Sequence, residues 1–336
     1  MTTIKKIKQL GSQWETQDPF LFCAYHLDTY PKGNKQLGPD TSLVGRNLGQ
    51  DFQIKDGWRM YHGTKVPGFP AHPHRGFETV TIVERGFADH SDSLGAAGRF
   101  GNGDVQWMTA GKGVQHCEMF PLLDQEKENP LLLFQLWLNL PRKNKMVAPH
   151  FKMLWNEEIP VHTITNAKGK QITLKLISGD YESQKAAPAA PDSWAADKEN
   201  KVAIWLITME AGASWDIPTA TGSVNRTLYF YDGSTIATEG HTIPMGHCMD
   251  LHADKEISIQ NGDAPGSFLF LQGKPIGEAV VQQGPFVMNS NREINEAIQE
   301  YRETAFGGWP WPTHDHTHAP ELGRFAQHAD GRLEEK

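Results

Sequence analysis

Hydrophobic residues follow a two-residue period in many short runs along the chain. In "LFQLWLNL" one face of an extended strand would carry Phe134, Leu136, Leu138 and Leu140, and the other face Gln135, Trp137 and Asn139. This alternation is typical of a strand and not of a helix. From Phe20 to about Leu154 such runs are separated by turn signals, among them "DG" at 56–57 and "GNGD" at 101–104. The pattern predicts strands joined by short turns.

Strand-like runs resume in the second half of the chain, at "VAIWLITM", "RTLYFYDG", "EISIQNGD" and "SFLFLQGKPI". Between the two sets of runs, residues 180–201 are rich in Ala, Pro and charge, and we interpret them as a linker or an exposed insertion. A chain of 336 residues suits two domains. Because "TVTIVERG" and "RTLYFYDG" hold comparable places in the two halves, we also expect an internal duplication.

The stretch "SNREINEAIQEYRET" changes to a helical period. Ser290 and Glu293 have the spacing of a capping box, and an apolar stripe for docking the helix follows at Ile294, Ala297, Ile298 and Tyr301. The tail after Gly308 is polar, and we expect the histidines of its "THDHTH" segment, His314, His316 and His318, to be solvated. These patterns predict an all-β protein of two tandem domains with one C-terminal helix.

Composition excludes several classes of partner. The net charge is −8 and no block of Lys and Arg occurs, which argues against direct nucleic-acid binding. The longest apolar run, "LLLFQLWLNL", is too short to span a membrane, and the N-terminus lacks the apolar core of a secretion signal. Three scattered cysteines, Cys23, Cys117 and Cys248, argue against a disulfide framework. We therefore expect a cytoplasmic protein, and a monomer.

Metal-ligand spacing occurs at "AHPHRGFETV", where His72 and His74 are one residue apart at the start of a predicted strand. Alternate side chains of a strand share a face, so both imidazoles would point the same way, and Glu78 would share their side. A lone pair of this kind is also compatible with two solvated loop histidines. The rest of the chain must therefore supply further ligands.

A second pair stands in "GDVQWMTAGKGVQHCEMF", where His116 and Glu118 are again one residue apart. On a strand they share a face, while Cys117 between them points the other way and is expected in the barrel wall. Two strands that each contribute two inward side chains could converge four groups on one point inside a small barrel. Three imidazoles and a carboxylate suit Fe(II), Mn(II), Ni(II), Cu(II) or Zn(II), and not calcium or magnesium.

Two alternatives stay open at this site. Four protein ligands leave open positions on a six-coordinate metal, as in catalysis, but would close the site around a four-coordinate structural zinc. The second half of the chain has no such pairs, and its His247 and His252 lack partners. We expect that half to keep the fold without a metal. Three aromatic residues near the pairs, Phe77, Trp107 and Phe134, are expected in the core.

Several segments together resemble one family. "HPHRGFETVT", "GDVQWMTAGKGVQHCEM", "LWLNLP", "KMVAPHF" and "QQGPFVMNSNREINEAIQEYR" resemble the pirin family, whose members are bicupin proteins of the cupin superfamily. The resemblance covers roughly residues 18–306, and "GGWPWP" in the tail is similar to bacterial members. It implies two tandem cupin domains, each a jelly-roll β-barrel. We place the metal-binding cupin at residues 1–155, a degenerate cupin with the helix at 156–306, and the polar tail at 307–336.

The resemblance also implies the chemistry. The metal ligands would be His72, His74, His116 and Glu118 around one mononuclear divalent metal, most often iron, with Glu78 as an alternative ligand or an orienting group. Several members act as quercetin 2,3-dioxygenases, which open the ring of a flavonol with O₂ and release carbon monoxide. In that function Glu118, as ligand or as base, would take the proton of the substrate hydroxyl.

Other members of the family act by binding proteins, as a transcriptional coregulator or as a modulator of a metabolic enzyme. A metal- or redox-responsive regulator with a protein partner is therefore the alternative to an enzyme acting on a small aromatic substrate and O₂. Residues 29–62 are longer than the corresponding family loop and lead directly into His72, so we expect them to cover the mouth of the site. This departure leaves the choice of substrate open.

Overall fold

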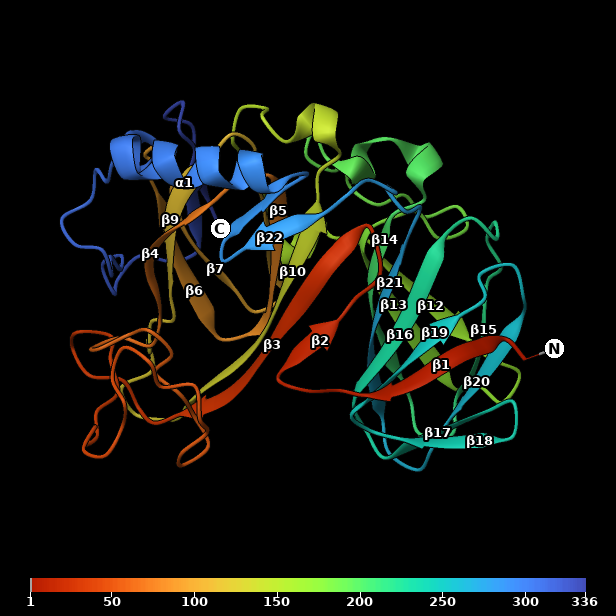
Figure 1. Cartoon of the computed structure of the whole chain (residues 1–336). Helices are drawn as coiled ribbons and strands as arrows, with labels where there is room; N and C mark the ends of the chain where they lie inside the picture. Colours follow the sequence, from red (N-terminus) through yellow and green to blue (C-terminus); the bar gives the residue numbers. More distant parts are fainter. Residues whose placement is uncertain (1) are drawn as a thin grey trace. The chain divides into compact units, whose positions relative to one another are not determined.

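The chain forms two compact β units in the computed structural model, which describes residues 2–336 (Figure 1). The first unit, as we call it, comprises Ala24–Asn156 and Glu278–Lys336, and the second unit comprises the chain up to Cys23 together with Glu157–Gly277. The expected all-β class with one C-terminal α-helix is confirmed. No helix in the described part of the chain is both long and apolar enough to cross a membrane.

The unit boundaries differ from the expected ones at both ends of the chain. The N-terminal strand β1 (Ile4–Gln9) pairs antiparallel with β19 (His247–Leu251) and so belongs to the second unit. Conversely, the helix expected in the second domain belongs to the first unit, together with the tail. A single boundary placed near residue 156 misses both of these assignments. Strand pairing between distant segments leaves little local signal in the sequence.

Two facing sheets enclose the interior of the first unit. One contains, in order, β11-β8-β5-β10-β3, and the other β25-β24-β7-β6-β9-β4. Apolar side chains from both sheets meet in one cluster, which includes Val83, Leu133 and Phe100. The bounds are β3 (Phe20–Tyr30), β4 (Gly68–His74), β5 (Phe77–Arg85), β6 (Phe87–Asp92), β7 (Ala97–Gly101), β8 (Asp104–Thr109), β9 (Val114–Met119), β10 (Asn129–Asn139), β11 (His150–Leu154), β24 (Phe325–Gln327) and β25 (Leu333–Glu335).

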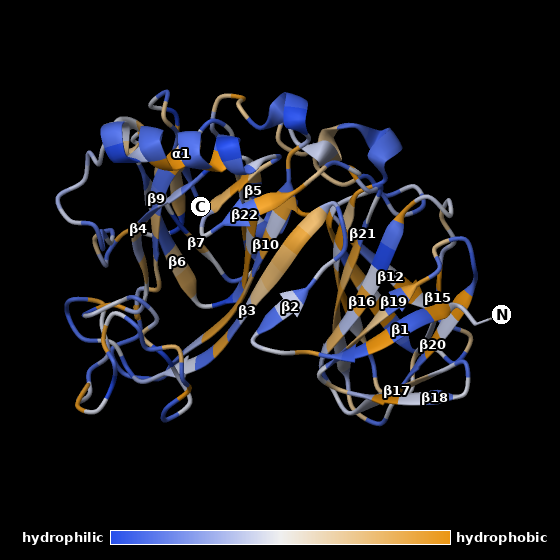
Figure 2. Ribbon diagram, viewed as in Figure 1, coloured by the Kyte–Doolittle hydropathy of each residue, from blue (hydrophilic) through white to orange (hydrophobic). Residues whose placement is uncertain are grey.

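The α-helix α1 (Asn291–Thr304) begins and packs as its sequence predicts. Ser290 accepts a hydrogen bond from the backbone N–H of Glu293, and donates its hydroxyl to the Glu293 carboxylate. Ile294 and Ala297 are buried in a cluster with Phe286 of the hairpin β22 (Val281–Gln283) and β23 (Phe286–Met288). In Figure 2 the hydrophobic colour of α1 is confined to one side. The capping box and the apolar stripe are confirmed.

The tail is packed in part, which corrects the expectation for His318 and not for His314, whose side chain is exposed. Strand β24 pairs with β7, so the tail extends a sheet of the first unit. Arg99 on β7 forms an ion pair with Asp89 and also donates to the backbone carbonyls of His318, Ala319 and Leu322. His318 is buried, and its Nε2 lies 2.9 Å from the carbonyl of His90. The polar composition of the tail suggested exposure, but polar groups of the tail are satisfied by hydrogen bonds to the buried Arg99–Asp89 ion pair.

Two sheets with an apolar interior form the second unit. Their orders are β1-β19-β16-β21-β14-β13-β12 and β15-β20-β17-β18. A large hydrophobic cluster is built from both sheets and includes Trp205, Phe230 and Phe270. The remaining elements are β2 (Gln13–Glu15), β12 (Val161–Thr165), β13 (Gln171–Ser178), β14 (Ala203–Met209), β15 (Ser214–Ile217), β16 (Asn225–Asp232), β17 (Thr235–Thr238), β18 (His241–Pro244), β20 (Ile257–Asn261) and β21 (Gly266–Gly273).

The Ala- and Pro-rich segment at 180–201 is an insertion within the second unit and does not link the two units. It joins β13 to β14 and contains two short 3-10 helices, η3 (Trp194–Ala196) and η4 (Lys198–Asn200). Both are capped by side chains, since Ser193 and Asp197 each accept a hydrogen bond from a backbone N–H two residues on. Three further 3-10 turns lie elsewhere: η1 (Arg142–Asn144), η2 (Asn156–Glu158) and η5 (Ala305–Gly307).

A buried lysine holds the turn between β4 and β5. Gly76 in this turn has φ +86°, and a Cβ there would lie 2.0 Å from the Val287 carbonyl oxygen, so only glycine fits. The Nζ of Lys145, whose residue is 1% exposed, donates to the carbonyl oxygens of Gly76 and Val287 and to Oδ1 of Asn139, at 2.8, 3.1 and 2.8 Å. All three N–H donors of the ammonium group are therefore used.

We predict that Lys145→Met lowers the free energy of unfolding by about 2–4 kcal/mol, because three buried acceptors lose their donor. Urea denaturation measures the change. Lys143→Met, at an exposed position two residues away, is the matched control and should change stability little. Equal stabilities of the two variants would contradict the role assigned to Lys145.

The same lysine gives a pH dependence of known sign. Burial lowers the pKa of Lys145 from its ordinary 10.5 to about 8. Between these values the unfolded chain binds more protons than the folded chain, so this group makes the free energy of unfolding rise as pH rises through that window. The stability gap between the parent and Lys145→Met should therefore widen from pH 7.5 to about pH 9.5. A gap that narrows would refute the assignment.

Candidate metal centre

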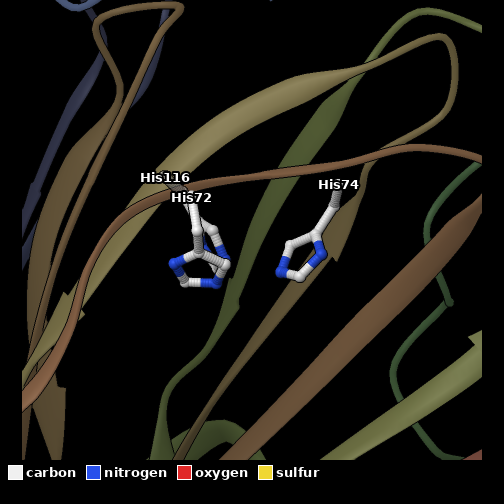
Figure 3. A group of neighbouring side chains, drawn as sticks. All are labelled: His72, His74 and His116. Carbon is white, nitrogen blue, oxygen red and sulfur yellow. The ribbon is translucent and has the colours of Figure 1, made fainter. Parts of the chain in front are cut away.

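Three imidazoles converge inside the first unit (Figure 3). Strands β4 and β9 pair antiparallel, with His72 directly opposite His116, and a register irregularity follows Phe69 on β4. The ring centroid of His72 lies 4.5 Å from that of His116, and the ring centroid of His74 lies 4.8 Å from each of the other two. One nitrogen from each ring can be chosen so that all lie within 4.8 Å of one another. The two predicted histidine-bearing segments are thus brought together.

The donor atoms fit a bound metal. The Nε2 atoms of His72 and His116 face each other at 3.1 Å, and the buried Nε2 of His74 has no hydrogen-bond partner among the described residues. Desolvation lowers the pKa of His72 to about 4 and holds those of His74 and His116 well below the usual 6.5. Neutral imidazole is the form that binds a transition metal. The His72, His74 and His116 group could therefore hold a metal ion.

Glu118 lies beside the imidazoles, with its carboxylate held by two neighbours. Its Oε2 is 3.9 Å from Nε2 of His116. Oε1 accepts a hydrogen bond from Oγ1 of Thr81 at 3.1 Å, and Oε2 accepts one from Nε2 of Gln135 at 2.5 Å. Burial raises the pKa of Glu118, while these hydrogen bonds oppose the rise. The carboxylate is close enough to serve the site, and its role as a ligand stays a prediction.

Glu78 does not share the side of the histidines, contrary to the expectation. The chain turns at Arg75 and Gly76, so the alternation of β4 does not continue into β5. On β5 it is Phe77 that contacts His74, with ring centroids 5.0 Å apart. Glu78 alternates to the opposite face, where Thr109 Oγ1 donates to its Oε1 at 2.7 Å. It is therefore not an alternative ligand in this structure.

His90 is a fourth imidazole at the site that sequence reasoning missed. It lies on β6, which pairs with β9 so that His90 is opposite Glu118. Its Nδ1 is 3.4 Å from Nδ1 of His116, and its ring stacks on Phe151 at 5.2 Å. His116 thus faces His72 with Nε2 and His90 with Nδ1. The strand-like alternation of Ala88, His90 and Asp92 in "FADHSD" is the sequence pattern that could have placed His90 on an inner face.

Other polar groups on the inner faces of the strands lack protein partners. The Oγ1 atom of Thr79 and both polar atoms of the Gln106 side chain are buried, with no hydrogen-bond partner among the described residues. Several buried polar atoms of the interior thus make no hydrogen bond within the described residues.

Aromatic residues pack beside the histidines. Trp137 stacks on Phe77 at 4.0 Å and lies 5.2 Å from His74, and its Nε1 donates to Oε1 of Gln135. All three aromatic residues expected in the core are buried, and Phe77 also contacts His74.

The long segment before His72 reaches the site through aromatic contacts. Phe69 lies 6.3 Å from His72 between ring centroids, and Tyr61, His62 and Phe52 surround Phe69 at 5.2, 5.7 and 6.4 Å. His72 is only partly buried, whereas His74 and His116 are 2% and 0% exposed. The segment therefore lies next to the most exposed of the three histidines, and both its cover over the mouth of the site and its effect on substrate choice stay predictions.

No second cluster occurs elsewhere in residues 2–336: the histidine triad is the one group of three His, Cys, Asp or Glu side chains with metal-like spacing.

Cys117 faces away from the site, with its Sγ 3.6 Å from the carbonyl oxygen of His316, in agreement with the expected register of β9. Of the tail histidines, His316 stacks on Trp311.

We predict that His90→Phe weakens metal binding by about 10–100-fold, because His116 loses the partner of its Nδ1 while the aromatic stack on Phe151 remains possible. Competition with a chromophoric chelator for Zn²⁺ measures the dissociation constant. His162→Gln, which removes a part-buried histidine of the second unit, is the control and should bind as the parent does. An unchanged affinity in His90→Phe would show that His90 does not support the ligand.

Comparison with known proteins identifies relatives over most of the chain. The family model described as Pirin matches residues 3–138, and the model described as Pirin C-terminal cupin domain matches residues 204–307. Pirin from Mus musculus is 38% identical over 251 residues, covering 74% of this chain and 80% of that protein. A Pseudomonas aeruginosa protein provisionally named quercetin 2,3-dioxygenase is 36% identical, covering 71% of this chain and 80% of its own.

A solved structure shares the architecture. The crystal structure titled quercetin 2,3-dioxygenase from Acinetobacter baumannii superimposes with a TM-score of 0.70 at 25% sequence identity, and covers 91% of this chain and 96% of its own. Together with the C-terminal cupin match, this likeness confirms the predicted fold of two cupin-type domains.

Proposed function

The chain belongs to the pirin family, and we propose that it is a metal-dependent dioxygenase that acts on quercetin-like flavonols or related enolic aromatics. The observation that carries the proposal is the convergence of His72, His74 and His116, with Glu118 beside them. Iron(II) is the metal we propose, on the resemblance to the family; Zn, Mn, Ni and Cu also suit this donor set. The proposed ligands are the three histidines, with Glu118 as the fourth.

Side chains of the protein are placed to accept the proton of a substrate hydroxyl at this site. A bound divalent metal would supply O₂ activation and would acidify an enolic hydroxyl of the substrate. Glu118 takes the proton of that hydroxyl. Thr81 and Gln135 keep the carboxylate oriented for this transfer. Phe77 and Trp137 pack around His74 and restrict the orientation of its ring.

The three cysteines support a cytoplasmic location, which we also propose. Cys23, Cys117 and Cys248 are all free and buried, as suits a reducing compartment. The partners in this proposal are the small aromatic substrate and O₂. The alternative function is that of a regulator that binds a protein, and the experiment below distinguishes it from the dioxygenase.

We predict that Glu118→Gln reduces turnover per bound metal by roughly 10²–10⁴-fold, because the amide keeps the size of the side chain but cannot take the substrate proton. His74→Ala, in contrast, should lower metal content and activity together, since it removes a ligand and no base. Turnover is measured as quercetin consumption and O₂ uptake, divided by the metal content of each preparation.

Glu78→Gln is the matched control, because the same change is made at a buried carboxylate on the other face of β5, and its amide oxygen can still accept from Thr109. It should retain parental turnover per metal. If Glu118→Gln matches the parent while Glu78→Gln does not, the assignment of the base is wrong. A metal-loaded parent that consumes no flavonol or related enol would overturn the dioxygenase proposal and favour the regulator.

A further inference from the structure

The second unit contains a pocket of about 780 Å³ at one end of its sheets. Its walls come from the insertion at 180–201 and from the adjacent ends of β14, β16 and β21. Arg226, the second residue of β16, pairs with Gln272 near the end of β21, and Gln272 also pairs with Ala203 at the start of β14. All residues that line the pocket belong to the second unit. The pocket is therefore built within one unit, from the segment that the sequence marked as an insertion.

Arg226 occupies an inner position of the second unit. The side chains that alternate with it on β16, Leu228 and Phe230, belong to the apolar core cluster, so Arg226 is on the same face at the edge of that core. Arg226 precedes Gly233 by seven residues (233 − 226 = 7), and Thr79 of the first unit precedes Gly86 by the same interval (86 − 79 = 7). By the internal duplication expected from the sequence, Arg226 corresponds to a threonine of the polar interior of the first unit.

The guanidinium group of Arg226 is buried without an acidic partner. The residue is 2% exposed, and its Nε and Nη2 both donate to Oε1 of Gln272, while Nη1 donates to the Pro218 carbonyl. No carboxylate within residues 2–336 forms an ion pair with it. Three of its five N–H donors are used, which leaves two. Burial lowers the pKa of Arg226 to about 10, in the absence of any compensating negative charge.

The other charged groups around the pocket do not neutralise this arginine. Asp180 accepts from Lys185 and Lys198 and from the backbone N–H of Ala186, so its charge is already matched. The Glu182 carboxylate is 66% exposed and lies near His162. The lining therefore holds three basic residues, namely Arg226, Lys198 and Lys201, and two acidic ones, Asp180 and Glu182, for a net charge of +1 (3 − 2).

The remaining lining is mostly apolar, with Ser178, Thr219 and Gln272 as its polar members. Trp205 and Tyr181 contribute aromatic surface, with ring centroids 5.4 Å apart, and alanines and prolines of the insertion also line the pocket. Inorganic phosphate would leave this surface uncovered, whereas an organic acid would cover it and place its anionic group against the arginine. We propose that the pocket binds a small-molecule monocarboxylate with an apolar, aromatic body, whose carboxylate is recognised by Arg226.

Isothermal titration of the full-length protein with 4-hydroxybenzoate tests the proposal, and 4-hydroxybenzamide is the neutral isostere. We expect saturable binding of one molecule of the acid per chain, and binding of the amide and of inorganic phosphate at least tenfold weaker. Arg226→Gln should weaken binding of the acid at least tenfold. Arg292→Gln, which makes the same change at an exposed site on α1, should have no effect.

Two further variants keep the test decisive. Ala187→Phe fills the pocket from the insertion while it retains Arg226, so it should abolish binding even if Arg226→Gln fails to fold. His74→Ala separates this pocket from a carboxylate bound to a metal in the first unit, and should leave binding intact. The proposal is overturned if the acid does not bind at millimolar concentration, if the amide or phosphate binds as tightly, if Ala187→Phe still binds, or if His74→Ala abolishes binding.

Discussion

The antiparallel register of β9 with β4 and β6 is the constraint on which the candidate metal centre depends. It places His116 opposite both His72 and Asp92, and Glu118 opposite His90. A shift of one residue would turn Cys117 inward and both predicted ligands outward. The outer face of β9 stabilises the correct register, because Cys117 and Met119 pack there against an apolar cluster, and Gln115 contacts α1 through the Tyr301 hydroxyl.

The interior of the first unit is polar, and this has an energetic consequence. Buried polar groups destabilise a fold unless they are paired. The chain pairs Glu118 with Thr81 and Gln135, but leaves Nε2 of His74 without a partner among the described residues. A metal ion would supply that partner. The second unit has the same kind of sheets around an apolar core, and there a polar group, Arg226, is confined to the edge of the core.

Local signals in the sequence predicted the strands, the capped helix and the two ligand pairs, because each depends on spacing within a few residues. The convergence of the three histidines depends on the pairing of β4 with β9, and was predicted only by assuming a small barrel and from the family resemblance. Glu78 was misplaced because a turn at Gly76 interrupts the alternation that was assumed to continue. His90 and the packing of the tail were missed because they depend on pairing between distant strands: β6 with β9, and β24 with β7. The Lys145 contacts to Gly76 and Val287 are likewise long-range and leave no pattern in the sequence.

The central claim is that one metal ion is bound by His72, His74 and His116. Anomalous X-ray diffraction, measured above and below the absorption edge of the metal that purifies with the protein, tests this claim most directly. The account predicts one strong peak per chain within bonding distance of a nitrogen of each of the three histidines, with Glu118 as the nearest carboxylate. A metal-loaded crystal with no peak among these rings, or with its main peak in the second unit, would contradict it.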